Sequence, residues 1–452
     1  MRNMKLNPFI YYRIYLDKLY MYDTKNKKAY QFNESAADMI DIIGNNPGLV
    51  YSDFIRHCME MYDAPQELIE NDANDFIKML MTRDILVNPE IDSKINTSFK
   101  QRIADTSDET DKDVEELMYT TVGEHKILSK ALLELTYRCN LKCVHCYAIG
   151  SGDARQEMDT NKWFDILDQL SDANVLSIVF TGGEVFVRDD FFEIFDYAIN
   201  KRFLVDIYSN GTKITDEQIG YIAGRYINSF QTSIYGDTPE LHDSITGVKG
   251  SFDKTLNTMR KFKEYGVSLT IKTIMMKQNA DSCSGMREIA NDLGAEFQIG
   301  LSISKTNNGA NTPTAFRVKS PEQMKSLLLE RDRELLNQRP EPKDLDKSLC
   351  GAGFNGISIT PSGKVLICNA IDLPIGDCKL EKIIDVWNES DELKSFRQKR
   401  ISNISKCACC KYLDYCQFCP GVALQDAGSI TEAYDEACFI AKMRYEALKQ
   451  HI

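Results

Sequence analysis

Apolar residues in the first 90 positions follow two spacings in succession. Alternating β-prone runs come first, and the spacing of one helical face then repeats three times. Three strands are predicted at 10–15, 19–22 and 29–32. Three helices follow, from 33 or 35 to 43, at about 51–62 and at 66–82, and a closing strand is predicted at 85–87. Asn33 or Ser35 is the predicted cap of the first helix, and the segment GNNPG ends it. Three strands followed by three helices predict a winged-helix-like domain over 1–90.

Strand-like and helical patterns alternate in the middle of the chain. A polar, charged stretch at 91–127 comes first, with the composition of a linker or a mobile helix. The predicted strands that follow are 132–136, 177–181, 204–209, 229–234, 268–275 and 295–300. Six β/α units in a row favour an α/β fold with a partial (β/α)6 TIM-type barrel over 128–310. In such a barrel the chemistry gathers at the carboxyl ends of the strands.

Composition and charge narrow the class of protein. The net charge is -13, which argues against nucleic acid as a partner and weakly against anionic membrane surfaces. No run of eighteen apolar residues occurs, and the first twenty residues lack the pattern of a signal peptide. We therefore expect a cytoplasmic protein with no membrane partner.

The fourteen cysteines are unusually many and unevenly placed. In a reducing cytosol, metal binding explains them better than disulfides. Ten fall into two spaced sets, and four fit neither set: Cys58, Cys283, Cys378 and Cys409. Iron–sulfur clusters need thiolates from several directions, so short loops combined with distant partners are the expected signature.

The first set lies just after the first barrel strand, at Cys139, Cys143 and Cys146. Its C-x3-C-x2-C loop supplies three thiolates to a four-iron cluster and leaves one iron open to another ligand. A zinc knuckle is the alternative, with His145 as a fourth ligand crowded into the same loop.

CNLKCVHCY followed by TGGE at 181–184 resembles the radical S-adenosylmethionine (SAM) superfamily. The resemblance implies a [4Fe–4S] cluster on the three cysteines, with S-adenosyl-L-methionine on the open iron. It implies that Gly182, Gly183 and Glu184 meet the methionyl amine, for which a carboxylate is a charge-assisted acceptor. Tyr147 is expected to pack near the adenine.

Further cofactor contacts are expected at the ends of later strands. By the same resemblance, Ser209 and Asn210 in YSNGT are candidates for the ribose. Ser233 is a candidate polar contact, and Lys272 is a candidate partner of the methionyl carboxylate. No catalytic acid or base side chain stands out.

The second set resembles the auxiliary-cluster extension called SPASM, within 311–452. Its members are Cys350, Cys368, Cys407, Cys410, Cys416, Cys419 and Cys438. The resemblance implies an outer cluster on Cys407, Cys410, Cys416 and Cys438, and an inner cluster on Cys350, Cys368 and Cys419. The chain departs from the usual family spacing because Cys416 and Cys419 are C-x2-C where C-x3-C is usual. Two zinc sites are the alternative.

Relatives with a full inner cluster often carry one more cysteine about six residues before Cys350. Here that stretch is 343–345 and holds no thiol. Cys378 could supply the ligand, although an isolated cysteine is more often a free one. This gap leads to the hypothesis that a cysteine of the substrate ligates the inner cluster as a thiolate.

The N-terminal segment resembles the element that recognises precursor peptides, where a leader peptide extends a sheet edge as an added strand. A DNA-binding winged helix is the alternative, against which net acidity counts. The edge at 29–32 is the candidate docking strand.

The whole layout resembles the maturases of thioether-bridged peptides, the sactipeptide and ranthipeptide enzymes that include the subtilosin maturase. The resemblance implies three [4Fe–4S] clusters, a cysteine-containing precursor peptide bound by its leader, and a flavodoxin- or ferredoxin-type electron donor. It implies that an adenosyl radical takes hydrogen from a peptide carbon, and that a cysteine sulfur closes on that carbon. The alternatives are a peptide C–C cross-linking or epimerising enzyme, and a non-catalytic iron–sulfur scaffold that binds peptides.

Overall fold

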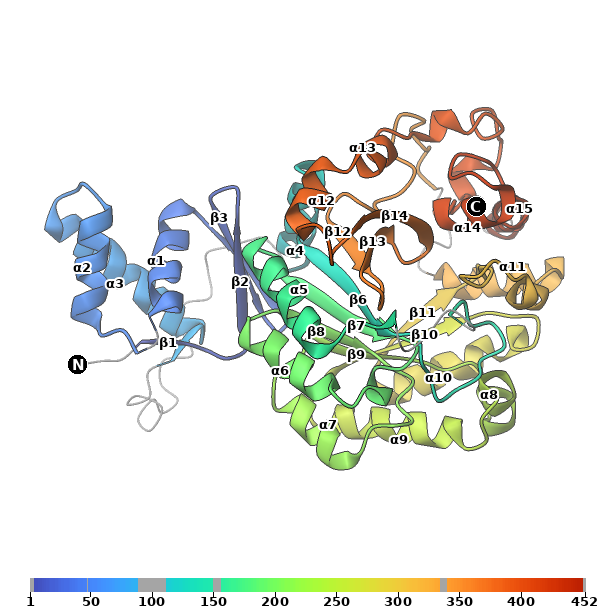
Figure 1. Cartoon of the computed structure of the whole chain (residues 1–452), viewed down its shortest axis with the longest axis horizontal. Helices are drawn as coiled ribbons and strands as arrows, with labels where there is room; N and C mark the ends of the chain where they lie inside the picture. The colour runs from blue at the N-terminus through green and yellow to red at the C-terminus, as the bar shows by residue number, and fades with distance from the viewer. Residues whose placement is uncertain (1–3, 47, 88–110, 149–155, 334–339, 450–452) are drawn as a thin grey trace. The chain divides into compact units, whose positions relative to one another are not determined.

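The computed structural model describes residues 4–46, 48–87, 111–148, 156–333 and 340–449 (Figure 1). The contacts within the chain divide it into two compact units, Met1–Glu124 and His125–Ile452. Each unit has its own hydrophobic core. The predicted linker spans 91–127, and its part up to residue 110 lies outside the described residues. Its remaining part includes helix α4 (Asp111–Glu124), which belongs to the first unit.

The first unit contains the three strands and three helices that the sequence predicts. Its elements are β1 Lys5–Leu6, β2 Ile10–Tyr15, β3 Lys18–Asp23, β4 Lys28–Phe32, α1 Glu34–Asn45, α2 Tyr51–Met61, α3 Gln66–Thr82 and β5 Leu86–Val87. Strands β2, β3 and β4 form one antiparallel sheet in that order. Asn33 caps α1 by accepting from the amide of Ala36. The closing strand β5 pairs with β1, which the sequence did not predict.

The second unit is built on a nine-stranded sheet with the order β11-β10-β9-β8-β7-β6-β12-β13-β14. Its first six strands along the chain are all parallel, as predicted. They are β6 Lys130–Thr136, β7 Ser177–Gly182, β8 Leu204–Tyr208, β9 Ser229–Ser233, β10 Ser268–Ile274 and β11 Glu296–Gly300. The sheet is a partial barrel, so the α/β fold class is confirmed.

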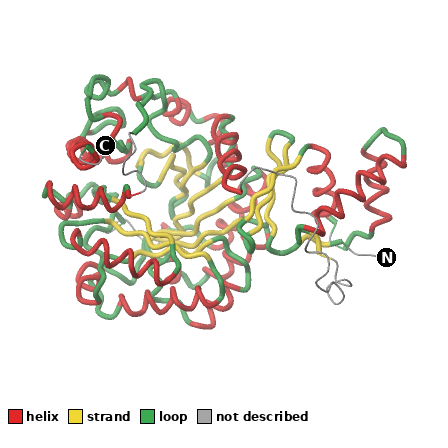
Figure 2. Tube along the Cα trace, turned by 180° about the vertical axis from the view of Figure 1, so that it is seen from behind, coloured by secondary structure: helices red, strands yellow, loops and turns green. Residues whose placement is uncertain are grey.

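Helices cover one face of this sheet, as Figures 1 and 2 show. They are α5 Thr160–Asp172, α6 Phe191–Asn200, α7 Asp216–Ala223, α8 Pro239–Thr246, α9 Ser251–Glu264, α10 Cys283–Leu293 and α11 Pro321–Arg331. Phe180 and Phe230 point from the strands into the core beneath the helices. Side chains alternate along a strand, so their neighbours lie on the inner face, where polar residues such as Glu134 and Lys272 occur.

The C-terminal region continues the same sheet. Strand β12 (Gly356–Ile359) runs parallel to β6, and β13 (Lys364–Cys368) and β14 (Ile371–Asp377) follow as antiparallel neighbours. Gly363 turns the predicted hairpin with a φ of 90°. The remaining helices are α12 Ile383–Glu389, α13 Asp391–Arg397, α14 Pro420–Ala427 and α15 Asp435–Leu448. Because β12 pairs with β6, the second cysteine set is attached to the barrel beside the first.

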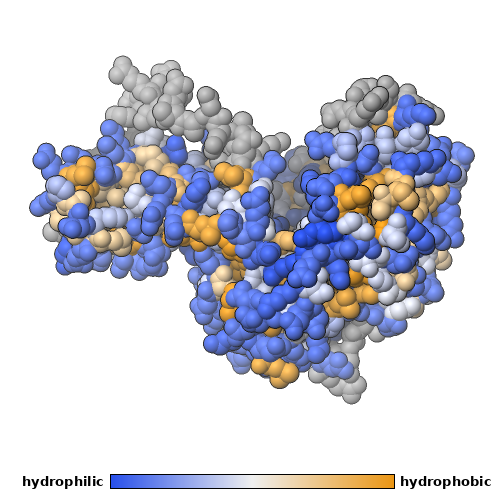
Figure 3. Space-filling model, turned by 90° about the horizontal axis from the view of Figure 1, so that it is seen from above, coloured by the Kyte–Doolittle hydropathy of each residue, from blue (hydrophilic) through white to orange (hydrophobic). Residues whose placement is uncertain are grey.

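Hydrophilic side chains cover most of the face shown in Figure 3, with apolar side chains in separate groups between them. Among the described residues, no helix combines the length and the apolar character needed to cross a bilayer.

Candidate active site

The loop of the first cysteine set follows β6 and is held by its neighbours. The amides of Lys142 and Val144 donate to the last two carbonyls of α8, with N···O distances of 2.8 and 3.0 Å. The side-chain amide of Asn210 donates to Cys139 Sγ at 3.7 Å. Hydrogen bonds from two other strand–helix units thus fix the loop at the carboxyl end of the sheet.

The three thiols of this loop lie near one another. Burial, together with the charges of Cys146 and Cys139, raises the pKa of Cys143 to about 12. Partial burial also raises the pKa of Cys139, whose side chain still reaches the surface. A bound cation would favour the thiolate form of these cysteines, because the thiolate is the metal ligand. His145, the fourth ligand in the zinc alternative, packs edge-on against Tyr235, with ring centroids 4.5 Å apart.

The glycine turn after β7 packs directly on the segment that leads into the cysteine loop. The amide of Gly183 donates to Thr136 O at 2.6 Å, and the amide of Glu184 donates to Arg138 O at 2.9 Å. A Cβ on Gly182 or Gly183 would clash with these carbonyls, and Gly182 has a φ of 136°. Only glycine allows this close approach of two backbones.

Glu184 is fully buried and joins the ends of β7 and β8. Its Oε1 accepts from Ser209 Oγ at 2.8 Å and from the amide of Phe186 at 3.1 Å, and its Oε2 accepts from the amide of Asn210 at 2.7 Å. Burial raises its pKa to about 6 in spite of these bonds. A carboxylate has about four lone-pair sites, so one remains for an ammonium group. The contact with a methionyl amine stays a prediction.

Ser233 and Lys272 lie side by side on the inner face, paired in register between β9 and β10. The Lys272 ammonium lies 3.7 Å from the centre of the Tyr208 ring. Burial lowers the pKa of Lys272 to about 8, although the charges of Asp206 and Glu296 oppose the shift. The structure thus gathers the predicted cofactor contacts at one end of the sheet, and their roles toward S-adenosylmethionine stay predictions.

One carboxylate of this region escaped the sequence prediction. Glu134 on β6 is 1% exposed, and both its oxygens accept from tyrosine hydroxyls. Tyr147 Oη donates at 2.7 Å and Tyr137 Oη at 2.9 Å. The sequence does single out Glu134, because it is the one acid in the apolar strand ALLELT and lies on the face opposite to Leu133 and Leu135. The predicted packing of Tyr147 near an adenine stays untested.

The inner thiols come together from three distant parts of the sequence. Burial is the largest cause that raises the pKa of Cys350, and the charges of Cys368 and Cys419 add to it. Burial also raises the pKa of Cys368, and the charges of Cys419 and Glu134 add to it. Cys378 lies elsewhere: its thiol is buried, donates to Gly363 O at 3.1 Å and has none of these cysteines as an electrostatic neighbour. The three thiols form the set assigned to the inner cluster.

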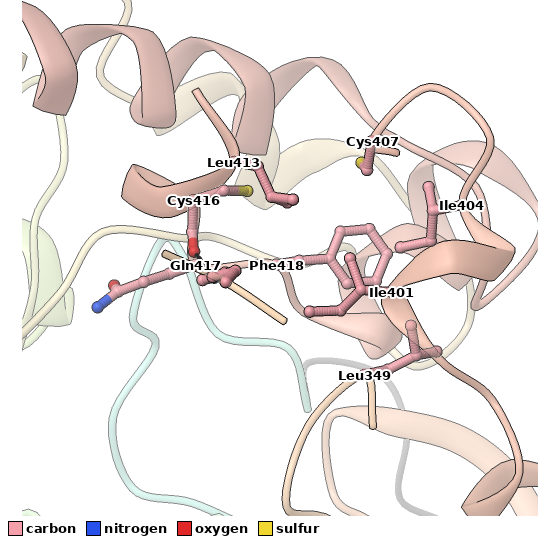
Figure 4. Close-up of a pocket in the computed structure, with 9 residues that line it drawn as sticks. Leu349, Ile401, Ile404, Cys407, Leu413, Cys416, Gln417 and Phe418 are labelled. Atoms are coloured by element: carbon pink, nitrogen blue, oxygen red, sulfur yellow. Dashed lines mark hydrogen bonds between the residues drawn. The ribbon is translucent and has the colours of Figure 1, made fainter. Parts of the chain in front are cut away.

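The outer thiols form a second group. Burial raises the pKa of Cys416 to about 11, with contributions from Cys407, Cys438 and Cys410, while Lys343 lowers it. A cavity of about 240 Å³ adjoins this group, and Figure 4 shows Cys407 and Cys416 among its lining residues. Apolar side chains make up much of the remaining lining: Leu349, Ile401, Ile404, Leu413 and Phe418.

Lys343 lies in the stretch just before Cys350, which holds no thiol. Its ammonium donates to the carbonyl of Cys416, and its amide donates to Asp414 Oδ1 at 3.0 Å. The stretch is therefore tied to the outer set, and it brings a positive charge there.

The residues present fit iron–sulfur clusters. In each group of thiols, the charges of neighbouring cysteines help to raise the pKa of at least one member, namely Cys143, Cys350 or Cys416. Among the described residues, no three His, Cys, Asp or Glu side chains converge tightly enough to hold a single ion. Thiolates of a cluster bind separate irons, so they need not converge on one point.

Comparison with known proteins gives two family matches. Residues 133–288 match the radical SAM superfamily, and residues 350–411 match the iron–sulfur cluster-binding domain SPASM. The first match includes Cys139, Cys143 and Cys146, and the second includes Cys350, Cys368, Cys407 and Cys410.

Two curated relatives and one solved structure illustrate the similarity. The mycofactocin maturase MftC of Mycolicibacterium smegmatis is 29% identical over 303 residues, which are 63% of this chain and 76% of MftC. The subtilosin biosynthesis protein AlbA of Bacillus subtilis is 30% identical over 249 residues, 53% of this chain and 54% of AlbA. The crystal structure of Streptococcus suis SuiB bound to precursor peptide SuiA has a TM-score of 0.58 at 19% identity, covering 97% of this chain and 100% of SuiB.

The fold and the two thiol sets therefore define a radical SAM enzyme with an auxiliary iron–sulfur region. Residues 133–288 carry a radical SAM domain, and residues 350–411 carry a SPASM iron–sulfur cluster-binding domain. Enzymes of this superfamily use S-adenosylmethionine and a [4Fe–4S] cluster, and SPASM domains bind further clusters.

Proposed function

We propose that this enzyme forms thioether cross-links in a ribosomally made precursor peptide, joining a cysteine sulfur to a carbon of the same peptide. The observation that carries the proposal is the inner thiol set. It has three protein thiols, Cys350, Cys368 and Cys419, while the additional candidate Cys378 lies apart, bonded to Gly363. A substrate cysteine would complete the set and be held as a thiolate.

The similarity to AlbA and the SuiB fold support a peptide as the substrate. The first unit supports it as well, because β4 is a terminal strand of its three-stranded sheet. A leader peptide would add to such an edge through backbone hydrogen bonds. We assign the leader to β4 and the electron supply to a flavodoxin- or ferredoxin-type protein.

The enzyme's own residues would bind and orient the cofactor and the peptide and shield them from water. When bound and reduced, the cluster of the first cysteine set supplies one-electron cleavage of S-adenosylmethionine, and the adenosyl fragment removes a hydrogen atom from carbon. Glu184 and Lys272 would hold the charged ends of the methionyl group. Cys350, Cys368 and Cys419 would hold one auxiliary cluster and the outer cysteines another, which gives three clusters in all.

Mass spectrometry tests this function directly. A cysteine-bearing precursor peptide is co-expressed anaerobically with the enzyme and alkylated at its thiols before fragmentation. We expect the loss of two hydrogens per cross-link, together with cysteines that resist alkylation. Loss of hydrogens with every cysteine still alkylated would mean a C–C bridge instead, and an unchanged mass with a shifted stereocentre would mean epimerisation.

A further inference from the structure

An arginine of the first unit lies over two aromatic rings of β4. The guanidinium of Arg83 is 5.3 Å from the centre of the Tyr30 ring and 6.0 Å from that of the Phe32 ring. Both rings are half-buried and stacked, with their centres 6.2 Å apart. Phe32 also meets Phe76 of α3 edge-on, with ring centres 6.2 Å apart. Strand β4 and helix α3 thus share one aromatic surface with a positive charge over it.

Arg83 has no acidic partner among the described residues: its guanidinium forms no salt bridge there and donates to no oxygen atom. A guanidinium has five N–H donors in a planar fork that matches a carboxylate. The aromatic rings attract the cation through their faces and use none of these donors. Arg83 therefore keeps its full capacity to bind a carboxylate from another molecule.

The register of the sheet shows which side chains of an added strand would meet this surface. Within the described residues, β4 pairs with β3 alone, and Tyr30 and Phe32 stand opposite Met21 and Leu19 of the first unit's core. A peptide that pairs with the other edge of β4 would place every second side chain on this same face. Its neighbours in sequence would point to the opposite face of the sheet.

We propose that Arg83 binds an aspartate or glutamate of the leader, and that the aromatic surface of Tyr30, Phe32 and Phe76 takes an apolar leader side chain two positions away. The spacing follows from the strand period of two, because both leader side chains must lie on one face. This inference rests on the proposed function, which assigns the leader to β4. It names the chemistry that the docking strand recognises: an acid and an apolar residue separated by one residue.

The net charge of the chain separates this contact from long-range attraction. At -13 the chain repels an acidic peptide, so long-range charge alone would make binding tighter whenever a leader acid is changed to lysine. The contact with Arg83 predicts the opposite at one position, where the Kd should rise at least about tenfold. The measurement is the fluorescence anisotropy of a labelled synthetic leader of the cysteine-bearing precursor peptide, titrated with the full chain, each leader acid being changed to lysine in turn. Equal or tighter binding for every change overturns the proposal.

Arg83→Glu is the reciprocal test. It should weaken binding of the native leader at least about tenfold and bind the leader with lysine at the identified position more tightly than the wild type does. Arg83→Lys keeps the charge but loses the planar fork, so its affinity for the native leader should also fall.

Arg56→Glu is the matched control, because it makes the same charge change on α2, where Arg56 pairs with Asp53. It should leave the Kd unchanged. Native affinity in Arg83→Glu overturns the proposal, and the leader series on the wild-type enzyme decides if that variant does not fold. Binding that depends on Arg83 but yields no thioether by mass spectrometry would support this contact and overturn the proposed function instead.

Discussion

At the level of single residues, the inner face of the barrel holds a lysine whose charged form is disfavoured by burial. Lys272 is largely buried over the Tyr208 ring, and this burial lowers its pKa from 10.5 to about 8. Between these two values the unfolded chain binds more protons than the folded one, so Lys272 makes folding more favourable as the pH rises. The lysine therefore costs stability at neutral pH, as expected of a residue kept for a ligand.

Lys272→Met removes this titration. Relative to the variant, the wild type should gain on the order of 1 to 2 kcal/mol between pH 8 and 10.5, after allowance for screening by solvent. Thermal unfolding of both proteins at pH 8 and pH 10 under anaerobic conditions measures the gain. An equal difference in unfolding temperature at both pH values would show that Lys272 titrates normally.

A second lysine, Lys343, places a positive charge near the outer thiols. Burial raises the pKa of Cys407 and of Cys416, and the positive charge of Lys343 opposes this rise because it favours the thiolates. The same charge favours the reduced, more negative state of a bound cluster. Lys343→Gln should therefore lower the reduction potential of the outer cluster, and Lys343→Arg should keep it. Redox titration followed by electron paramagnetic resonance decides, and an unchanged potential in an iron-replete Lys343→Gln contradicts the assignment.

At the scale of elements, the junction between β4 and α1 sets the entry to the first unit's helices. Asn33 follows β4 directly, and its Oδ1 accepts from the Ala36 amide at 3.1 Å. Asn33→Ala should cost about 1 kcal/mol in helix stability. Faster hydrogen exchange of the first turn of α1 would report the loss. Asn45→Ala at the exposed far end of α1 is the control and should leave exchange in that turn unchanged.

The elements with strong periodicity could be predicted from the sequence. All six parallel strands appear within two residues of their predicted bounds, because buried strands and amphipathic helices leave a repeating pattern. Strand β1 has only two residues and no pattern, and its partner β5 lies some 80 positions away. Local reasoning could not find such a pair.

The candidate site could be predicted in its residue types but not in its connections. The three cysteines of the first set lie in one short loop, so their spacing in the sequence was enough to predict that they lie close together. The meeting of Cys350, Cys368 and Cys419, and the place of Glu134 beside them, depend on the pairing of β12 with β6. That pairing joins segments more than 200 residues apart and leaves no local signal.

At the scale of the whole molecule, the core of the second unit draws every buried member from that unit. We expect His125–Ile452 to keep its clusters and to release 5′-deoxyadenosine under strong reductant. It should fail to modify a leader-bearing peptide, because the proposed docking strand β4 belongs to the first unit. Full peptide modification by the truncated chain, measured by mass spectrometry beside the full chain, would refute the role given to β4.

Ligation of the inner cluster by the substrate is tested most directly by the electron paramagnetic resonance spectrum of the reduced enzyme with its peptide bound and no S-adenosylmethionine present. We expect a peptide with its native cysteines to change the signal of the inner cluster, because a substrate thiolate becomes its ligand. The same peptide with serine in place of each cysteine should bind and leave the signal as it is in the free enzyme. Identical spectra for the two peptides at saturating concentration would contradict the completion of the inner set by the substrate.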